Sequence, residues 1–533
     1  MNRTRNALVA LALLGGFVVP VLYHAPQARA DDDEKELKKA RKAVKKNMKK
    51  LLKAADELEK AKERLRITSV KEEQKREEIG AQIDQLRAVC FQTIEDVRKA
   101  DDDKAAEYLC EFATTVRDED VYERVVDELY RLEHKESIDW MVGVLNHEDK
   151  GKRGEENVWK LQILCANALA GVEGEDIDQA FARILEHGTN APVVNAVVQK
   201  ARDRKAPIVI KGLIDLLGRV EAKGGWEYYT VRQVLTSITG EDFFTKEKWA
   251  NYWAKVENGW DPSKKGETQE AATRERGPQE TIPTFFGSEI ESNRMMFVID
   301  SSGSMQMTDK PKDSDMSDAD YRAADPDSDA IKANKRMERA KRETMNAIKA
   351  LQPTQRFNVI DFDSGAHKWQ ENLVDATEAN KEAAVEWIKG SIVDSGGTYT
   401  DVALELAFSD PEVDTIYLLS DGAPFQKIGN PAPRDEWPKD ANGKTDDNQP
   451  VAGEQQIQFA GEMITKILDY VRFENRFRHV KIFTFGMDGP GVWHKKWPQP
   501  RPVTLPTDAR WLSTLSNFMR ELAAITGGEY RSI

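Results

Sequence analysis

The side chains most able to do chemistry stand in three short polar stretches far apart in the sequence. They offer only oxygen atoms as ligands: Asp300, Ser302, Ser304, Thr398 and Asp421. An all-oxygen set suits a hard divalent cation, with Mg²⁺ first and Mn²⁺ or Ca²⁺ as substitutes. Ser302 and Ser304 are two residues apart in a tight loop, so both hydroxyls are able to turn to one ion. The alternative is that these side chains only cap loops and helix starts.

Apolar runs and helical patterns alternate over residues 284–533. Continuous apolar runs are typical of strands buried on both faces of a parallel sheet. The pattern predicts strands at 295–299, 357–362, 415–419 and 480–485, and helices at 331–351, 376–389, 401–407, 453–473 and 511–525. This alternation favours a doubly wound α/β sheet, whose sites form beyond the carboxyl ends of strands. Asp300 and Asp421 both stand at such ends.

The three polar stretches resemble, in order, the metal-binding stretches of the von Willebrand factor type A (VWA) domain, of a bacterial secreted type. The matching segments are Phe297-Val-Ile-Asp-Ser-Ser-Gly-Ser-Met305, Gly396-Gly-Thr-Tyr-Thr400 and Leu418-Leu-Ser-Asp-Gly422, with further likeness at Arg356–Ile360 and Leu522–Tyr530. The resemblance covers roughly residues 284–533 and implies a Rossmann-like α/β domain there.

The resemblance also implies a function. VWA domains hold a cation at a metal-ion-dependent adhesion site (MIDAS), which places Mg²⁺ at Asp300, Ser302, Ser304, Thr398 and Asp421. If the direct ligands are mostly neutral, the ion keeps strong Lewis acidity and attracts a carboxylate from a protein partner. We therefore expect an exported, non-enzymatic binding protein. A metal-dependent hydrolase and an envelope scaffold with a purely structural metal loop are the alternatives.

Long insertions interrupt the family pattern. Gln306–Asp329 is strongly acidic, and Asp325, Asp327 and Asp329 begin like a calcium loop, but the Gly and bidentate Glu of an EF-hand are missing. A solvated loop that screens the site or selects a basic ligand is therefore favoured. Ala423–Ala452 is expected to shape the rim of the site. Met487–Arg510 is a further insertion whose place relative to the site the sequence does not give.

Motifs for catalysis are absent from the sequence. There is no Gly-x-Ser-x-Gly elbow and no His-Glu-x-x-His, and the seven histidines are scattered. Gly443-Lys-Thr445 ends like a phosphate loop, but Pro438 stands where the first glycine is required. Asp300 as a phosphatase nucleophile lacks the second acid, since Ser302 occupies that position. We expect no catalytic residues and no organic cofactor.

The amino-terminal thirty residues read as a targeting segment. Arg3 and Arg5 precede an apolar stretch, and Ala28-Arg-Ala30 supplies small residues before Asp31. This order is typical of a cleavable secretory signal, and an uncleaved membrane anchor is the alternative. Three cysteines are too few for a disulfide scaffold and are not spaced as a zinc site, so buried thiols are favoured. The net charge of −14 argues against a nucleic-acid binder.

Residues 31–100 predict a charged helical arm. Apolar residues recur every seven positions from Leu37 to Leu65, which indicates a short coiled coil or a helical hairpin. Between Lys35 and Lys53 there are ten basic residues and one acid. This excess favours a solvated helix face, with weak contact to an anionic envelope surface as the alternative.

The rest of the amino-terminal half is predicted to be helical. Residues 101–260 show helix after helix with self-similar ends, which favours a small stack of HEAT type over an irregular bundle. Trp249 and Trp253 lie one turn apart and are expected in the core. Residues 261–283 predict a flexible linker. The chain is therefore multidomain, with an all-α half before the α/β half.

Overall fold

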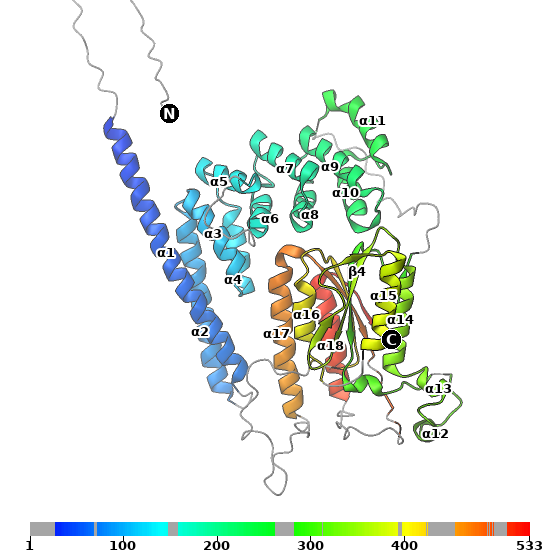
Figure 1. Ribbon diagram of the computed structural model, residues 1–533. Coiled ribbons are helices and arrows are strands. Elements are labelled where there is room, and N and C mark those ends of the chain that lie inside the picture. Colours follow the sequence, from blue (N-terminus) through cyan, green and yellow to red (C-terminus); the bar gives the residue numbers. More distant parts are fainter. Residues whose placement is uncertain are drawn as a thin grey trace, which may run out of the picture.

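A computed structural model of the chain describes residues 27–68, 72–147, 158–261, 282–311, 313–392, 397–422, 424, 454–487, 489, 491–492, 494 and 509–533. Helices form its first half, and a sheet flanked by helices forms its second half (Figure 1). The predicted signal segment lies outside the described residues up to position 26, and the predicted linker lies outside them from 262 to 281.

The helical half begins with a hairpin of two long helices, α1 and α2, and continues as shorter helices. Their bounds are α1 Gln27–Ile67, α2 Glu73–Arg98, α3 Asp103–Thr115, α4 Glu119–Leu129, α5 Lys135–Leu145, α6 Val158–Leu169, α7 Glu175–His187, α8 Ala191–Lys200, α9 Pro207–Val220, α10 Gly225–Thr239, α11 Lys246–Val256 and the 3₁₀ turn η2 Glu257–Gly259.

The shorter helices stack in two layers. Helix α6 packs on α8, α7 on α9, α8 on α10 and α9 on α11, so that each helix meets the one two places on. This is the contact pattern of a helical solenoid. Trp249 and Trp253 are buried in its core, as predicted.

The seven-residue repeat of α1 forms an intramolecular seam. Val44, Leu51 and Leu58 are buried against α2 and α3, which makes the arm a hairpin within one chain. Asp118 caps α4 and pairs with Arg87 at 2.9 Å and with Lys62 at 3.2 Å, so that it ties the hairpin to the helical stack.

The repeat makes a testable prediction about stability. Replacing the fully buried Leu58 with alanine is expected to lower the free energy of unfolding by about 2–5 kcal/mol, because it leaves a cavity in the seam. Leu52, on the same helix and 52% exposed, is the matched control. Its replacement by alanine is expected to change stability by less than about 0.5 kcal/mol in the same urea titration. Equal losses for both variants would contradict the packing of this seam.

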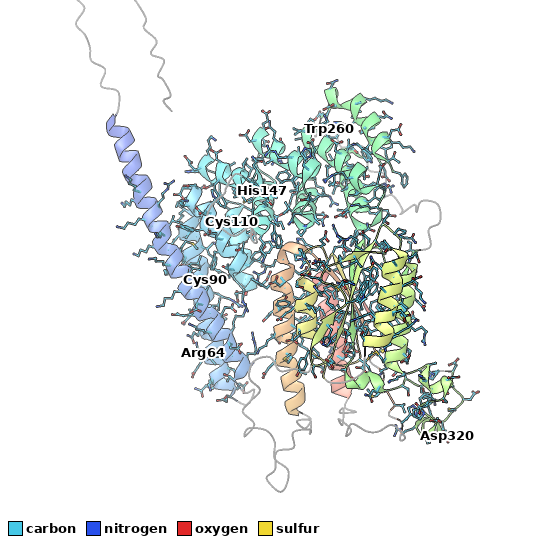
Figure 2. The ribbon with its side chains drawn as sticks, viewed as in Figure 1. Arg64, Cys90, Cys110, His147, Trp260 and Asp320 are labelled. Atoms are coloured by element: carbon cyan, nitrogen blue, oxygen red, sulfur yellow. The ribbon has the colours of Figure 1, made fainter. Side chains whose placement is uncertain are left out.

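Other predictions about the helical half are answered directly. The three cysteines are buried, and Figure 2 shows Cys90 and Cys110 inside the helical half. Within the described part of the chain, no helix is both long enough and apolar enough to cross a bilayer.

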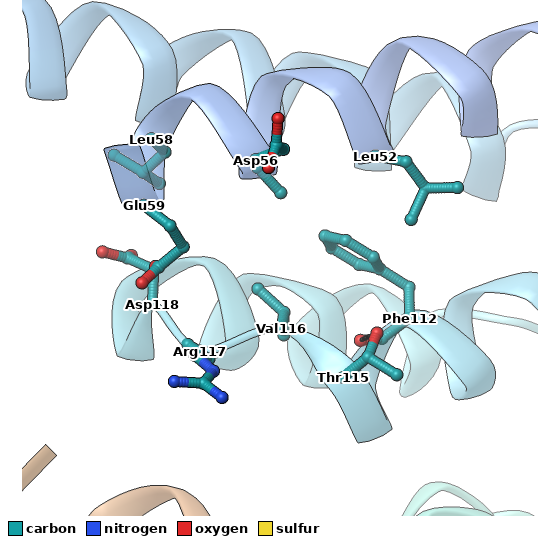
Figure 3. Close-up of a pocket in the computed structure, with 10 residues that line it drawn as sticks. Leu52, Asp56, Leu58, Glu59, Phe112, Thr115, Val116, Arg117 and Asp118 are labelled. Carbon is teal, nitrogen blue, oxygen red and sulfur yellow. Dashed lines mark hydrogen bonds between the residues drawn. The ribbon is translucent and has the colours of Figure 1, made fainter. Parts of the chain in front are cut away.

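A small open cavity of about 210 Å³ lies between α1 and the α3–α4 junction, with Leu52 and Phe112 at one end and Glu59 and Asp118 at the other (Figure 3).

The second half is a seven-stranded sheet in the residues that the structure describes, preceded by a two-stranded hairpin. The hairpin strands are β1 Thr284–Phe285 and β2 Ser288–Glu289; the sheet strands are β3 Arg294–Asp300, β4 Arg356–Phe362, β5 Ala366–Lys368, β6 Val374–Asp375, β7 Thr415–Ser420, β8 Lys481–Gly486 and β9 Tyr530–Ser532. The order is β5-β4-β3-β7-β8-β9, with β6 paired to β4. Strands β4, β3, β7, β8 and β9 run parallel, as a doubly wound fold requires.

Helices cover both faces of this sheet. Their bounds are the 3₁₀ turn η3 Gly303–Gln306, α12 Asp318–Ala323, α13 Asp329–Lys332, α14 Arg336–Ala350, α15 Glu378–Ser391, α16 Thr400–Phe408, α17 Glu454–Arg478 and α18 Ala509–Thr526. Phe297 and Ile299 of β3 pack towards α14 and α15, whereas Met296 and Val298 pack towards α16, α17 and α18. The alternation follows from the two-residue period of a strand and confirms the predicted α/β class.

The two halves are joined by direct contacts at the edge where the strands begin. Arg294, the first residue of β3, pairs with Glu227 of α10 at 2.6 Å. Farther along, the last turn of α17 reaches into the helical half, where Phe477 is buried between Tyr122 and Trp159. The carboxyl ends of β3 and β7, where the polar stretches stand, therefore lie at the edge of the sheet away from the helical stack.

Candidate metal centre

Parallel pairing of the central strands brings the first and third polar stretches together. Strand β3 pairs with β7 in the register Ile299↔Leu419, so both strands end at the same edge of the sheet. Asp300 is the last residue of β3, and Asp421 follows the last residue of β7. Asp300 and Ser302 are at most 2% exposed, and Asp421 is 8% exposed.

A chain of hydrogen bonds links these side chains. The Ser302 amide donates to Asp300 Oδ1 at 2.8 Å, and the Ser302 and Ser304 hydroxyl oxygens are 3.0 Å apart. The Ser304 hydroxyl donates to Asp421 Oδ1 at 2.6 Å. The Ser420 hydroxyl donates to Asp300 Oδ2 at 2.5 Å, which closes the ring from β7 back to β3.

Thr398 comes from the second stretch, which leads into α16. A Cβ atom placed on Gly422 would lie 3.1 Å from Thr398 Oγ1, so the threonine hydroxyl lies directly beside the third stretch and a side chain at position 422 would press on it. The loop is held because the Gly397 amide donates to the Ser364 hydroxyl at 2.8 Å. The structure thus brings all five predicted residues to one place. Gly396 lies outside the described residues.

Burial and like charge shape the titration of the two acids. Burial first, and then the neighbouring charge of Asp421, raise the pKa of Asp300 to about 7 against the lowering effect of hydrogen bonds from Ser420 and Ser302. Burial also raises the pKa of Asp421, against the lowering effect of the Arg336 guanidinium. Two adjacent buried carboxylates with one guanidinium leave an excess of negative charge, which is costly in a low-dielectric site.

These residues fit a divalent cation. The donor set consists of two carboxylates and three hydroxyls, so every donor atom is oxygen. The excess charge of the set is negative, and a bound cation would neutralise it. Beside Thr398, the buried oxygens Thr400 Oγ1 and Asp401 Oδ1 have no hydrogen-bond partner. No group of three or more His, Cys, Asp or Glu side chains suited to a metal occurs in the described residues.

Two contacts of the site escaped the sequence analysis. Ser420 was detectable in principle, since it directly precedes Asp421 at the end of a buried strand. Arg336 was not, because the long acidic insertion separates it from the first stretch. Its guanidinium donates to Asp421 Oδ2 at 2.9 Å and to Asp309 Oδ1 at 2.8 Å.

The insertions form a rim beside this site. The acidic insertion is more ordered than a solvated loop, because it contains α12 and ends at the first residue of α13, and because Met307 and Thr308 near its start are buried. Thr308 pairs with Val492 of the later insertion, and its hydroxyl lies 2.8 Å from His494 Nε2. The described parts of the 487–510 insertion therefore lie against the acidic insertion. The 423–452 insertion lies outside the described residues except at Pro424.

Comparisons with known proteins agree with the geometry. Residues 295–423 match the sequence profile of the von Willebrand factor type A domain. Human von Willebrand factor A domain-containing protein 3B is 44% identical over 71 residues, which are 13% of this chain and 5% of that protein. Mouse inter alpha-trypsin inhibitor, heavy chain 4, is 28% identical over 164 residues, which are 28% of this chain and 14% of that protein. The chain thus spans only a small part of these relatives.

Solved structures with a weaker likeness include a von Willebrand factor type A protein from Catenulispora acidiphila, at 18% identity and a TM-score of 0.25 over 46% of this chain and 39% of the other. Another is the PilB minor pilin from Streptococcus sanguinis, at 16% identity and a TM-score of 0.27 over 46% and 58% of the two chains. The profile match falls on the strands and loops that carry Asp300, Thr398 and Asp421. Residues 295–423, within the carboxy-terminal half of this chain, therefore carry the von Willebrand factor type A domain that the profile describes.

Proposed function

We propose that this chain is an exported interaction protein whose VWA domain binds Mg²⁺ and, through it, an acidic group of a protein partner. The observation that carries this proposal is the convergence of two buried carboxylates and three hydroxyls at one edge of the sheet. That edge lies on the side of the sheet opposite the helical stack, as the position of α12 and α13 shows in Figure 1.

Each residue has a distinct role in this proposal. The hydroxyls of Ser302, Ser304 and Thr398 are the neutral ligands. Asp300 and Asp421 supply the charge that holds the cation and orient the hydroxyls, as their bonds to Ser420 and Ser304 already do. When bound, the cation supplies an open coordination position for a carboxylate oxygen; Mn²⁺ or Ca²⁺ would serve the same residues.

The other parts of the chain have supporting roles. We place the protein in the periplasm or outside the cell, after cleavage of residues 1–30 or with them kept as an anchor. The basic face of α1 would add weak contact with an anionic envelope surface. No enzymatic step is assigned, since in this proposal Asp300 and Asp421 both serve the cation.

The test is a pull-down with the full-length protein from its native envelope. A partner captured in Mg²⁺, released by EDTA and by excess free aspartate, and lost with Asp300→Ala would support the proposal. Capture that survives EDTA and Asp300→Ala would favour the scaffold, in which the helical half makes the contacts. EDTA-sensitive turnover of phosphoester or peptide substrates would favour a hydrolase.

The raised pKa of Asp300 makes a prediction about pH. In the metal-free protein, the folded carboxyl keeps its proton between its ordinary pKa of 3.8 and about 7, while the unfolded one has released it. The free energy of unfolding is therefore expected to fall as pH rises through this window. Mg²⁺ requires the ionised carboxylate, so its affinity should rise about tenfold per pH unit up to about pH 7 and then level off. Calorimetric titrations at pH 5.5, 6.5 and 7.5 measure this, and a flat profile would contradict it.

A further inference from the structure

Arg336 is a fully buried cation at the edge of the candidate metal centre. It is the first residue of α14 and is 1% exposed. Its backbone amide donates to the carbonyl of Met307 at 2.9 Å, which fixes the helix start against the acidic insertion. A guanidinium this deeply buried needs partners for its charge and its donors.

Its partners divide between the metal centre and the rim. Nη1 donates to Asp421 Oδ2 at 2.9 Å. Nη2 donates to Asp309 Oδ1 and to the carbonyl of Gly489, both at 2.8 Å, and Nε donates to Asp309 at 3.0 Å. Asp309 also accepts from Arg339 at 2.8 Å, so its charge is balanced without taking that of Arg336.

In this arrangement both carboxylate oxygens of Asp421 accept a hydrogen bond. Its Oδ2 accepts from Arg336, and its Oδ1 accepts from the Ser304 hydroxyl. The negative charge of Asp421 is thus balanced by the guanidinium, and Asp300 alone remains to face a bound cation with a full charge. A divalent ion bound beside these three side chains leaves one net positive charge. Without Arg336, the same set would be neutral.

We propose that Arg336 is the residue that makes the metal-loaded site select an anionic partner group. This inference rests on the proposed function and adds a reason why the partner group that binds the metal carries a negative charge. Arg336 acts as a positioning and charge-setting residue: it holds the Asp421 carboxylate by a hydrogen bond at 2.9 Å, would weaken cation binding by repulsion, and would leave the surplus positive charge that draws a carboxylate. The cost in metal affinity and the gain in anion affinity have one cause.

The test compares wild type, Arg336→Met and Arg336→Lys in the full-length protein. Mg²⁺ affinity is measured by calorimetry. Acetate binding is measured with Mn²⁺ in place of Mg²⁺, since acetate that displaces a metal-bound water lowers water proton relaxation. Arg336→Met is expected to bind Mg²⁺ about 10- to 100-fold more tightly and acetate at least about tenfold more weakly. Arg336→Lys is expected to restore both values in part.

The two affinities are expected to change in opposite directions in Arg336→Met, and this distinguishes the proposed role of Arg336 from a purely structural one. If Arg336 only supports the fold, its loss weakens both Mg²⁺ and acetate binding, and that outcome overturns the inference. Arg342→Met removes the same charge from the same helix, at a half-exposed position with no contact to Asp421, and is expected to change neither affinity more than about twofold.

A second variant keeps the inference testable if Arg336→Met does not fold. Asp309→Asn removes one negative charge beside Arg336 and Arg339 and so adds to the local positive charge; Mg²⁺ binding is therefore expected to weaken and acetate binding to strengthen. Unchanged affinities in this variant would also overturn the inference. The proposed function fails separately, if wild type and Asp300→Ala bind Mg²⁺ alike.

Discussion

Replacing Asp300 with alanine is expected to weaken Mg²⁺ binding by more than about 100-fold. The residue ends β3 with its side chain wholly buried, and it accepts hydrogen bonds from the Ser302 amide and the Ser420 hydroxyl. Its loss therefore removes both the charge that holds the ion and the acceptor that orders the loop. Calorimetric titration of the full-length protein with Mg²⁺ measures the effect.

Two controls make this result specific. Asp327→Ala removes an exposed acid from the acidic insertion and is expected to leave Mg²⁺ affinity unchanged within about twofold, because exposed charges are well screened. Asp300→Asn keeps the shape of the side chain and is expected to lose Mg²⁺ binding while keeping the fold. Full Mg²⁺ binding by either Asp300 variant would show that the cation site lies elsewhere.

Phe477→Ala is expected to lower the free energy of unfolding by about 3–5 kcal/mol. The ring is 1% exposed and makes edge contacts with Tyr122 and Trp159 at centroid distances of 6.1 and 6.2 Å. Its removal leaves a cavity between the two halves rather than within one of them. We therefore expect the single unfolding transition of wild type to split into two in a calorimetric scan.

A variant at the neighbouring position tests the polar part of the same contact. Arg476 pairs with Glu119 at 2.7 Å and donates to the carbonyl of Val116 at 2.6 Å. Arg476→Ala is expected to act in the same direction as Phe477→Ala. Limited proteolysis should then release the two halves more quickly. A single unshifted transition in both variants would mean that the halves are held together by other contacts.

The sequence was sufficient for the four central strands, β4, β3, β7 and β8, because they are largely buried on both faces, whereas the short strands β5 and β6 carry no such signal. Continuous apolar runs such as Met295–Ile299 have no other stable place in a soluble domain, and the polar residue after each run marks the edge where a site forms. The five candidate ligands follow from that pattern. That a cation binds them remains a prediction.

The contacts that escaped prediction depend on tertiary structure. The amphipathic pattern of 331–351 suggested one helix, but the helix is interrupted between α13 and α14. This interruption places Arg336 at the start of α14, where its guanidinium contacts Asp421. The predicted helix 453–473 continues to Arg478, because its last turn packs on the helical half rather than on the sheet. No local pattern tells which of two cores an apolar residue such as Phe477 will enter.

The insertion of the α17 end into the helical half has a consequence during synthesis. Arg476 contacts Glu119 across 357 residues of sequence. At about 5–20 residues per second, the ribosome needs roughly 20–70 s to make the later partner after the earlier one. During that interval the apolar surface around Tyr122 and Trp159 in the nascent helical half is not covered by Phe477, which has not yet been made. Chaperones bind apolar surfaces of this kind. Phe477 covers this surface in the finished fold, so the helical half is expected to complete its packing around Tyr122 and Trp159 only after the end of α17 has been made.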